Sequence, residues 1–175
     1  FFLCRQTTAY EIRLSLVGSD MCIRDRTGGV DPESFVHAKF IVIWACNSIS
    51  TNLHHWPFVL EAQKRGAKVV VVDCYRSRTA KQADWHIAPK PGTDGALAMG
   101  FINSMIEQGL VDQEYVDNYV SGYPELKERA KEFTPEYVEE ITGVKAEDIA
   151  TFARAFATSP PSAIRIRVAI HRSPG

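Results

Sequence analysis

The sequence predicts an α/β domain of the Rossmann-like, three-layer kind with a mainly parallel sheet. Two runs, residues 40–44 and 68–73, are almost continuously apolar and rich in β-branched side chains. Continuous hydrophobicity is typical of strands that are buried on both faces, as in a parallel sheet covered by helices. A helical stretch separates the two runs, so together they predict a βαβ unit with a right-handed crossover.

The helix between these strands has clear signals at both ends. Pro57 suits a first helical turn, and Gly66 is placed as a left-handed cap beyond the last turn. Basic side chains in the last turn complement the helix dipole. The apolar face and the basic end are formed by Trp56, Val59, Leu60, Lys64 and Arg65.

A third short strand is expected at 84–88, and a turn follows it at 91–94. Asp94 ends that turn as a good N-cap for a helix that runs to Gly109. Helical spacing places the apolar residues of this helix on one side, which predicts that this side packs against the sheet. Those residues are Leu97, Phe101, Ile102, Met105 and Ile106.

The stretch 111–157 is expected to form several short helices, and 163–170 to form a final strand. Two glycines and one Thr-Pro pair separate the helices, because glycine ends a helix and Thr-Pro supplies an N-cap and a first helical residue. The separators are Gly122, Thr134 with Pro135, and Gly143. The last helix has its apolar face at Ile149, Phe152, Ala153 and Phe156.

Composition limits the classes of function. The 175 residues suffice for one domain with a sizeable core, and 45% hydrophobic with 23% charged residues is typical of a soluble globular protein. A net charge of −1 without a basic stripe excludes nucleic acid as the expected partner. No apolar run approaches the roughly 20 residues of a transmembrane helix, so no membrane span is expected.

The cysteines and the common nucleotide motifs narrow the choice further. No two of the cysteines form a CxxC pair, which argues against a zinc ribbon or an iron–sulfur cluster and favours free thiols. No ligand spacing supports a metal site from His54, His55 and a cysteine. GxGxxG is absent after the first strand, which disfavours an NAD-type dehydrogenase, and the absent P-loop motif excludes a P-loop nucleotidase. The cysteines are Cys4, Cys22, Cys46 and Cys74.

The pattern changes near residue 26. Residues 11–17 alternate as a short strand would, but the run 11–26 also resembles translated sequencing-adapter sequence. On that interpretation residues 1–26 are a non-native or disordered extension, and the domain comprises residues 27–175. Because the chain ends directly after the last expected strand, we expect a domain that is truncated at both ends.

Candidate binding groups fall at the carboxyl ends of the expected strands, where parallel sheets collect ligands. The loop at 45–52 begins with Ala45, Cys46, Asn47 and Ser48. Its amides could hold a phosphate, or it could be a plain strand-to-helix loop capped by Thr51 or Asn52.

Two acidic residues occupy equivalent places. Asp73 could accept hydrogen bonds from two ribose hydroxyls, or it could be a turn residue that ends its strand. In the turn Gly92-Thr93-Asp94, the carboxylate could accept from a guanine N1–H and amino group, or it could only cap the helix. The residues alone leave both pairs of alternatives open.

Taken together, several segments resemble the dimethyl sulfoxide reductase family of molybdopterin oxidoreductases. The family binds a molybdenum or tungsten ion through two molybdopterin guanine dinucleotides. Single segments are weakly specific, but their order and spacing are specific over most of the chain. The matching segments are FIVIWACN (40–47), EAQKRGAKVVVVD (61–73), RTAKQAD (78–84), KPGTDGAL (90–97), DNY (117–119), Gly122, TPE (134–136) and ITGV (141–144).

The resemblance implies a set of cofactor contacts. Asn47 with its loop would contact the phosphates or guanosine, Asp73 would hold the guanosine ribose, and Thr93 with Asp94 would contact the guanine. Arg172 and Gly175 match an Arg-containing, Gly-rich turn that in the family leads back toward the active site. The full set implied to bind the cofactor is Ala45, Cys46, Asn47, Ser48, Asp73, Arg78, Gly92, Thr93, Asp94 and Arg172.

The sequence also departs from the family pattern. Ala45, Ser48 and Cys74 stand where the family commonly has Gly, Pro and Pro. Ala45 would restrict close backbone approach if the turn needs a positive φ. The family's metal-ligating residue lies upstream of the first matched strand, and any iron–sulfur cluster belongs to that N-terminal part, so this chain alone is expected to be inactive.

The expected function is therefore that of a fragment of a molybdenum- or tungsten-dependent oxidoreductase which binds the guanosine end of molybdopterin guanine dinucleotide. Its partners would be the cofactor and the remainder of the parent polypeptide, in a cytoplasmic or periplasmic enzyme. Two alternatives are a non-catalytic nucleotide-binding α/β module, such as the central domain of a thiamine-dependent enzyme, and an NAD-type dehydrogenase domain. The leading interpretation requires Asn47, Asp73 and Asp94 to converge on one groove.

Overall fold

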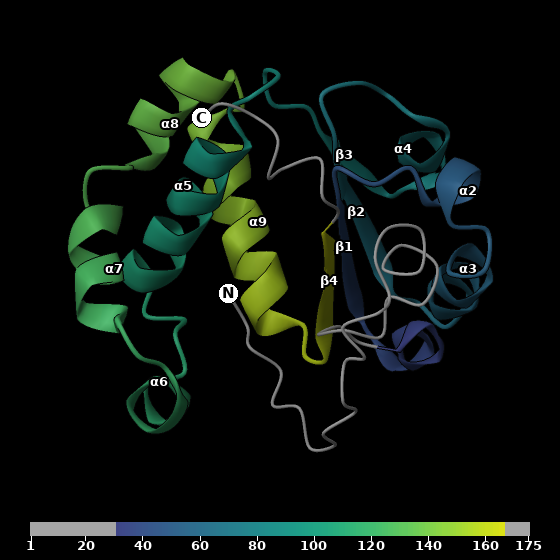
Figure 1. The fold of residues 1–175 in the computed structure, drawn as a ribbon, viewed down its shortest axis with the longest axis horizontal. Coiled ribbons are helices and arrows are strands. Elements are labelled where there is room, and N and C mark those ends of the chain that lie inside the picture. Colours follow the sequence, from purple (N-terminus) through teal and green to yellow (C-terminus); the bar gives the residue numbers. More distant parts are fainter. Residues whose placement is uncertain (1–30, 167–175) are drawn as a thin grey trace, which may run out of the picture.

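Four parallel strands form the centre of the computed structural model, which describes residues 31–166 (Figure 1). The strand order is β3-β2-β1-β4, and in the register Val42 of β1 pairs with Val70 of β2 and Ile164 of β4. The strands are β1 (Phe40–Trp44), β2 (Lys68–Val72), β3 (Trp85–Ile87) and β4 (Ser162–Ile166). All five residues of β1 are buried, as the apolar runs predict, and the α/β class with a parallel sheet is confirmed.

Helices cover both faces of this sheet, so the three-layer arrangement is also confirmed (Figure 1). Side chains of a strand alternate between faces. Phe40, Val42 and Trp44 pack toward the layer of α5 and α9, while Ile41 and Ile43 pack toward the opposite layer. The second layer contains η1 (Pro32–His37), α2 (Ser48–Thr51), α3 (Trp56–Lys64) and α4 (Arg78–Gln82). The first contains α5 (Asp94–Glu107), α6 (Gln113–Tyr119), α7 (Tyr123–Ala130), α8 (Pro135–Thr142) and α9 (Ala146–Thr158).

Most of the end signals act as their chemistry predicts. Gly66, after α3, has a φ of 94°, and Gly143, after α8, has a φ of 76°, a left-handed region that glycine enters without strain. Thr134 caps α8 by accepting a hydrogen bond from the Tyr137 N–H at 3.3 Å. These contacts set the direction in which each helix leaves its turn.

Two of the expected caps are wrong. Asp94 is the first residue of α5 rather than its N-cap, which is Thr93, because the Asp94 carboxylate is hydrogen-bonded to the sheet instead. Thr51 and Asn52 cap no helix start, since the short helix α2 already occupies Ser48–Thr51 and the N-cap of α3 is His55. Residues 1–30 and 167–175 lie outside the described residues, so the expected 1–26 extension, the boundary at 27 and the end of the last strand stay predictions.

Within residues 31–166, every helix is too short or too polar to cross a bilayer.

Candidate cofactor-binding site

The carboxyl ends of β1 and β2 lie side by side, and the chain crosses over from β3 to α5 beside them (Figure 1). This edge is held at its centre by the indole of Trp44, the last residue of β1, whose Nε1 donates to Asp94 Oδ1 at 2.8 Å. The bond ties the start of α5 to the end of β1. It is the only hydrogen bond that the Asp94 side chain makes within the described residues, so its second oxygen can accept from a ligand.

Asp73 follows β2 at the same edge and is almost fully buried, with 8% of its surface exposed. The nearby backbone N–H groups of Tyr75 and Cys74, the Cys74 thiol and His86 favour its ionised form and lower its pKa. Burial outweighs them and raises the pKa of Asp73 above its ordinary value. The Asp73 carbonyl accepts from Nε2 of His86 at 2.9 Å, which fixes the backbone there.

Along with burial, Asp73 and Asp94 both raise the pKa of the Cys74 thiol. The pKa of the Cys74 thiol is raised, first by burial and then by the negative charge of Asp73, and Asp94 adds to it. The thiol in turn lies 3.7 Å from Asp73 Oδ1. The structure therefore places both carboxylates within electrostatic reach of one point on the sheet edge.

Asn47 reaches this edge as well, but its side chain is already engaged. Its Oδ1 accepts from the Thr79 hydroxyl at 2.9 Å, and its Nδ2 donates to the Tyr75 hydroxyl at 3.4 Å. Thr79 Oγ1 also accepts from the Ile49 N–H at 3.2 Å. This network joins the loop after β1 to the segment after β2, so the side chain of Asn47 holds two loops together.

The remaining residues of the first loop turn their side chains inward. Ala45 has a φ of 50°, the positive value that glycine adopts most easily, and its N–H donates to the Val72 carbonyl at 2.8 Å. The Cys46 and Ser48 side chains are buried and lie 3.4 Å apart, close enough for a hydrogen bond. What this loop can offer a ligand is therefore its backbone.

The other residues that were expected to contact the cofactor differ in whether their side chains are free to bind a ligand. Gly92 has a φ of 82° in the turn before α5, and the Thr93 hydroxyl donates to the Lys90 carbonyl at 2.7 Å within that turn. Arg78, the first residue of α4, is exposed and makes no side-chain hydrogen bond or ion pair within 31–166. Arg172 lies outside the described residues.

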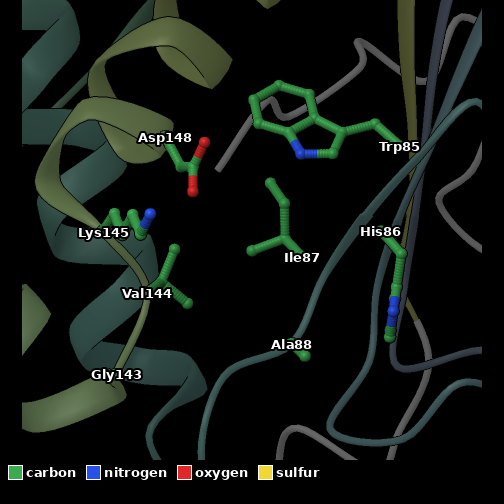
Figure 2. A pocket seen from close by; sticks show the side chains of 8 residues that line it. All are labelled: Trp85, His86, Ile87, Ala88, Gly143, Val144, Lys145 and Asp148. Carbon is green, nitrogen blue, oxygen red and sulfur yellow. The ribbon is translucent and has the colours of Figure 1, made fainter.

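A cavity of about 210 Å³ lies elsewhere, between β3 and the α8–α9 junction (Figure 2). Figure 2 shows Trp85, Ile87 and Asp148 turned toward it, while His86 lies on the other side of its strand. None of the residues expected to bind the cofactor lines this cavity. Within residues 31–166, no group of three or more His, Cys, Asp or Glu side chains is arranged to hold a metal ion.

Residues 13–168 match the molybdopterin oxidoreductase family. The chain belongs to this family. It is 43% identical over 140 residues to a probable oxidoreductase of Bacillus subtilis, YoaE, covering 80% of this chain and 21% of that protein. It is 38% identical over 152 residues to acetylene hydratase of Syntrophotalea acetylenica, covering 82% of this chain and 21% of that protein.

A solved structure gives the same result for the fold. The chain superposes on acetylene hydratase from Pelobacter acetylenicus with a TM-score of 0.71 and 32% identity, covering 85% of this chain and 22% of that one. The chain thus spans about a fifth of the length of the relatives it matches.

The groups at the sheet edge fit one half of a guanine dinucleotide by their donor and acceptor chemistry. Two carboxylates supply acceptors, which suit the hydroxyls of a ribose and the N–H groups of a guanine. Loop amides and the exposed Arg78 supply donors for phosphate oxygens. Sequence reasoning missed Trp44, Tyr75 and Thr79, which hold the edge together, although a Trp at a strand end and a Tyr two residues after Asp73 were visible signals.

Proposed function

We propose that this chain binds the guanosine diphosphate end of a molybdopterin guanine dinucleotide, as the cofactor-holding part of a molybdenum- or tungsten-dependent oxidoreductase. The observation that carries the proposal is the pair Asp73 and Asp94, two carboxylates with acceptor capacity at one edge of a parallel sheet in a chain of the molybdopterin oxidoreductase family. The domain would comprise residues 27–175, and the remainder of the parent polypeptide would complete the enzyme.

Each residue would have one task. The Asp73 carboxylate would accept from the two ribose hydroxyls, and the Asp94 carboxylate would accept from the guanine N1–H and amino group. Backbone amides of residues 46–48, which follow the engaged Ala45 N–H, and the guanidinium of Arg78 would hold the phosphates. When bound in the intact enzyme, the cofactor supplies two-electron redox chemistry at its metal.

The proposal revises the task of Asn47. Its amide oxygen bonds to Thr79 and one of its two N–H groups bonds to Tyr75, so we assign it to positioning the phosphate-binding loop instead of contacting the guanosine. Cys46 and Ser48 would likewise act through their backbone, because their side chains are buried against each other.

Calorimetric titration of the 175-residue chain with GDP and ADP tests this function. We expect GDP to bind more tightly than ADP, because adenine lacks the N1–H and amino pair that Asp94 accepts. Asp94→Asn should remove most of that preference, and Asp73→Asn should weaken both nucleotides by about tenfold or more, since a charged acceptor is lost. Glu136→Gln on α8 serves as a control for loss of one negative charge. Equal affinity for GDP and ADP, or no binding by a cooperatively folded chain, would overturn the proposal.

A further inference from the structure

Tyr75 is the exposed aromatic residue nearest in sequence to Asp73, and no role in binding has been assigned to it above. It follows β2 by three positions, 57% of its surface is exposed, and its hydroxyl lies 3.4 Å from Asn47 Nδ2. An exposed tyrosine usually has a freely moving ring. The hydroxyl of Tyr75, in contrast, is hydrogen-bonded to Asn47 in the loop that follows β1.

The hydrogen-bond network fixes the direction of that attachment. Thr79 Oγ1 accepts from the Ile49 N–H, and its own hydrogen goes to Asn47 Oδ1. The amide nitrogen of Asn47 therefore faces Tyr75 and donates to the phenol oxygen. Because that oxygen is an acceptor in this bond, the single hydrogen of the hydroxyl remains available for a ligand.

The position of the hydroxyl identifies the chemistry of that ligand. It lies against the loop after β1, whose contribution to binding is backbone N–H groups. It belongs to the segment after β2, in which the backbone N–H of Tyr75 lies near the carboxylate of Asp73. A neutral O–H donor that is held against a loop of amide donors, on the segment that also carries the proposed ribose acceptor, suits an anionic oxygen of the first phosphates beyond the ribose.

We propose that the Tyr75 hydroxyl donates a hydrogen bond to the diphosphate of the bound guanosine nucleotide, with Asn47 and Thr79 holding it in place. This inference rests on the proposed nucleotide site and adds a specificity contact to it. Tyr75 would then be a binding residue, while Asn47 and Thr79 would be positioning residues.

The test measures the contribution of the phosphates to binding separately from that of the nucleoside. Calorimetric titration of the 175-residue chain should show Tyr75→Phe weakening GDP by about tenfold, the range for a hydrogen bond to a charged group, with guanosine affinity unchanged. Inorganic pyrophosphate is the third ligand, and its binding should also weaken if the hydroxyl recognises phosphate by itself. Tyr137→Phe on α8 is the matched control, because it removes an exposed phenol hydroxyl far from this edge in sequence.

A double-mutant cycle tests the positioning network. Asn47→Ala should weaken GDP in the wild-type background but have little further effect on the Tyr75→Phe chain, because the two residues serve one contact. Fully additive losses, an equal effect of Tyr75→Phe on guanosine and GDP, or no effect on GDP would overturn the inference. The proposed function fails by a different result, namely no preference for GDP over ADP in the chain with Tyr75 intact.

Discussion

The two helical layers hold the sheet by different means. The layer of α5, α8 and α9 packs through aromatic rings, with the Phe152 ring 4.8 Å from Phe101, 6.1 Å from Trp85 and 6.5 Å from Phe40. The layer of α2 and α4 also packs apolar side chains, but it adds a set of buried polar groups near the carboxyl edge. These are Ser48, Asp73, Ser77 and Thr79, whereas the buried polar groups of the first layer, Asn103, Ser104 and Thr142, lie within its helices.

The difference separates a scaffold from the proposed binding site. Apolar contacts are nondirectional, so the aromatic cluster of the first layer can supply stability without fixing polar atoms at the carboxyl edge of the sheet. Hydrogen bonds are directional, so those of the second layer fix the positions of atoms at the sheet edge. The cost is that polar groups are buried there, and each of them must find a hydrogen-bond partner. Substitutions in the first layer should therefore change the free energy of unfolding most, and those in the second should change binding.

Phe152→Ala should have the largest effect on stability. Its side chain is fully buried and contacts aromatic rings from β1, β3 and α5, so truncation leaves a cavity at the centre of the layer. We expect a loss of about 3–5 kcal/mol in the free energy of unfolding, measured by urea denaturation. Phe133→Ala, at a half-buried position, should cost clearly less. A small effect of Phe152→Ala would break the assignment of this layer as the scaffold.

Gly100→Ala tests the close contact of α5 with α8. A Cβ at Gly100 would lie 2.8 Å from Val138 Cγ2, and Val138 is fully buried, so the helices would have to shift. The expected cost is about 1–3 kcal/mol. Gly95→Ala in the same helix meets no atom within 4 Å and should be neutral or stabilising.

The double substitution with Val138→Ala checks the cause of that cost. It makes room at the crossing, so part of the loss from Gly100→Ala should be recovered relative to the two single changes. Additive losses would show that the contact between these two positions is not the reason.

Asp73→Asn should show the opposite behaviour in the second layer. Because burial raises the pKa of Asp73, its ionised form opposes folding above that pKa, and the protonated form is favoured in the folded state as pH falls. The variant should therefore be more resistant to urea than the wild type at pH 7, while its nucleotide affinity is lower.

The pH dependence provides the check. The stability difference between the two chains should shrink as pH falls through the raised pKa of Asp73, since the wild-type carboxyl then becomes neutral as well. Over the same range, nucleotide binding by the wild type should weaken as its charged acceptor is lost. If the variant is less stable than the wild type at every pH, the Asp73 carboxylate stabilises the fold, and the proposed difference between the binding layer and the scaffold layer is wrong.

The scaffold was predictable from the sequence because its signals are periodic and local. Local patterns predict its strands and helices directly: the apolar runs of β1 and β2, the glycine at 66 that ends a helix, and the apolar face around Phe152. The four-residue helix α2 was not, because a helix this short has too few positions to show a period.

The site was predictable only in part. Strand ends predicted Asp73 and the loop at 45–48 as candidate binding groups, because the position of both depends only on where a strand stops. Whether Asn47 faces a ligand or Thr79 depends on contacts across 32 positions of sequence, which no local pattern encodes. The same reason explains Asp94, whose bond to Trp44 spans 50 positions and replaces the expected helix cap.

Ala45→Gly should change the free energy of unfolding least. Ala45 lies where the two layers meet. A φ of 50° costs a residue with a Cβ about 1 kcal/mol or more, and glycine adopts it freely, but glycine also loses more entropy on folding. The net gain in the free energy of unfolding should therefore be about 0.5–1 kcal/mol by urea denaturation. Ala83→Gly, at a φ of −80°, should lose stability instead. If both changes destabilise equally, the backbone of the loop after β1 is not strained, and the alanine has no cost at this edge.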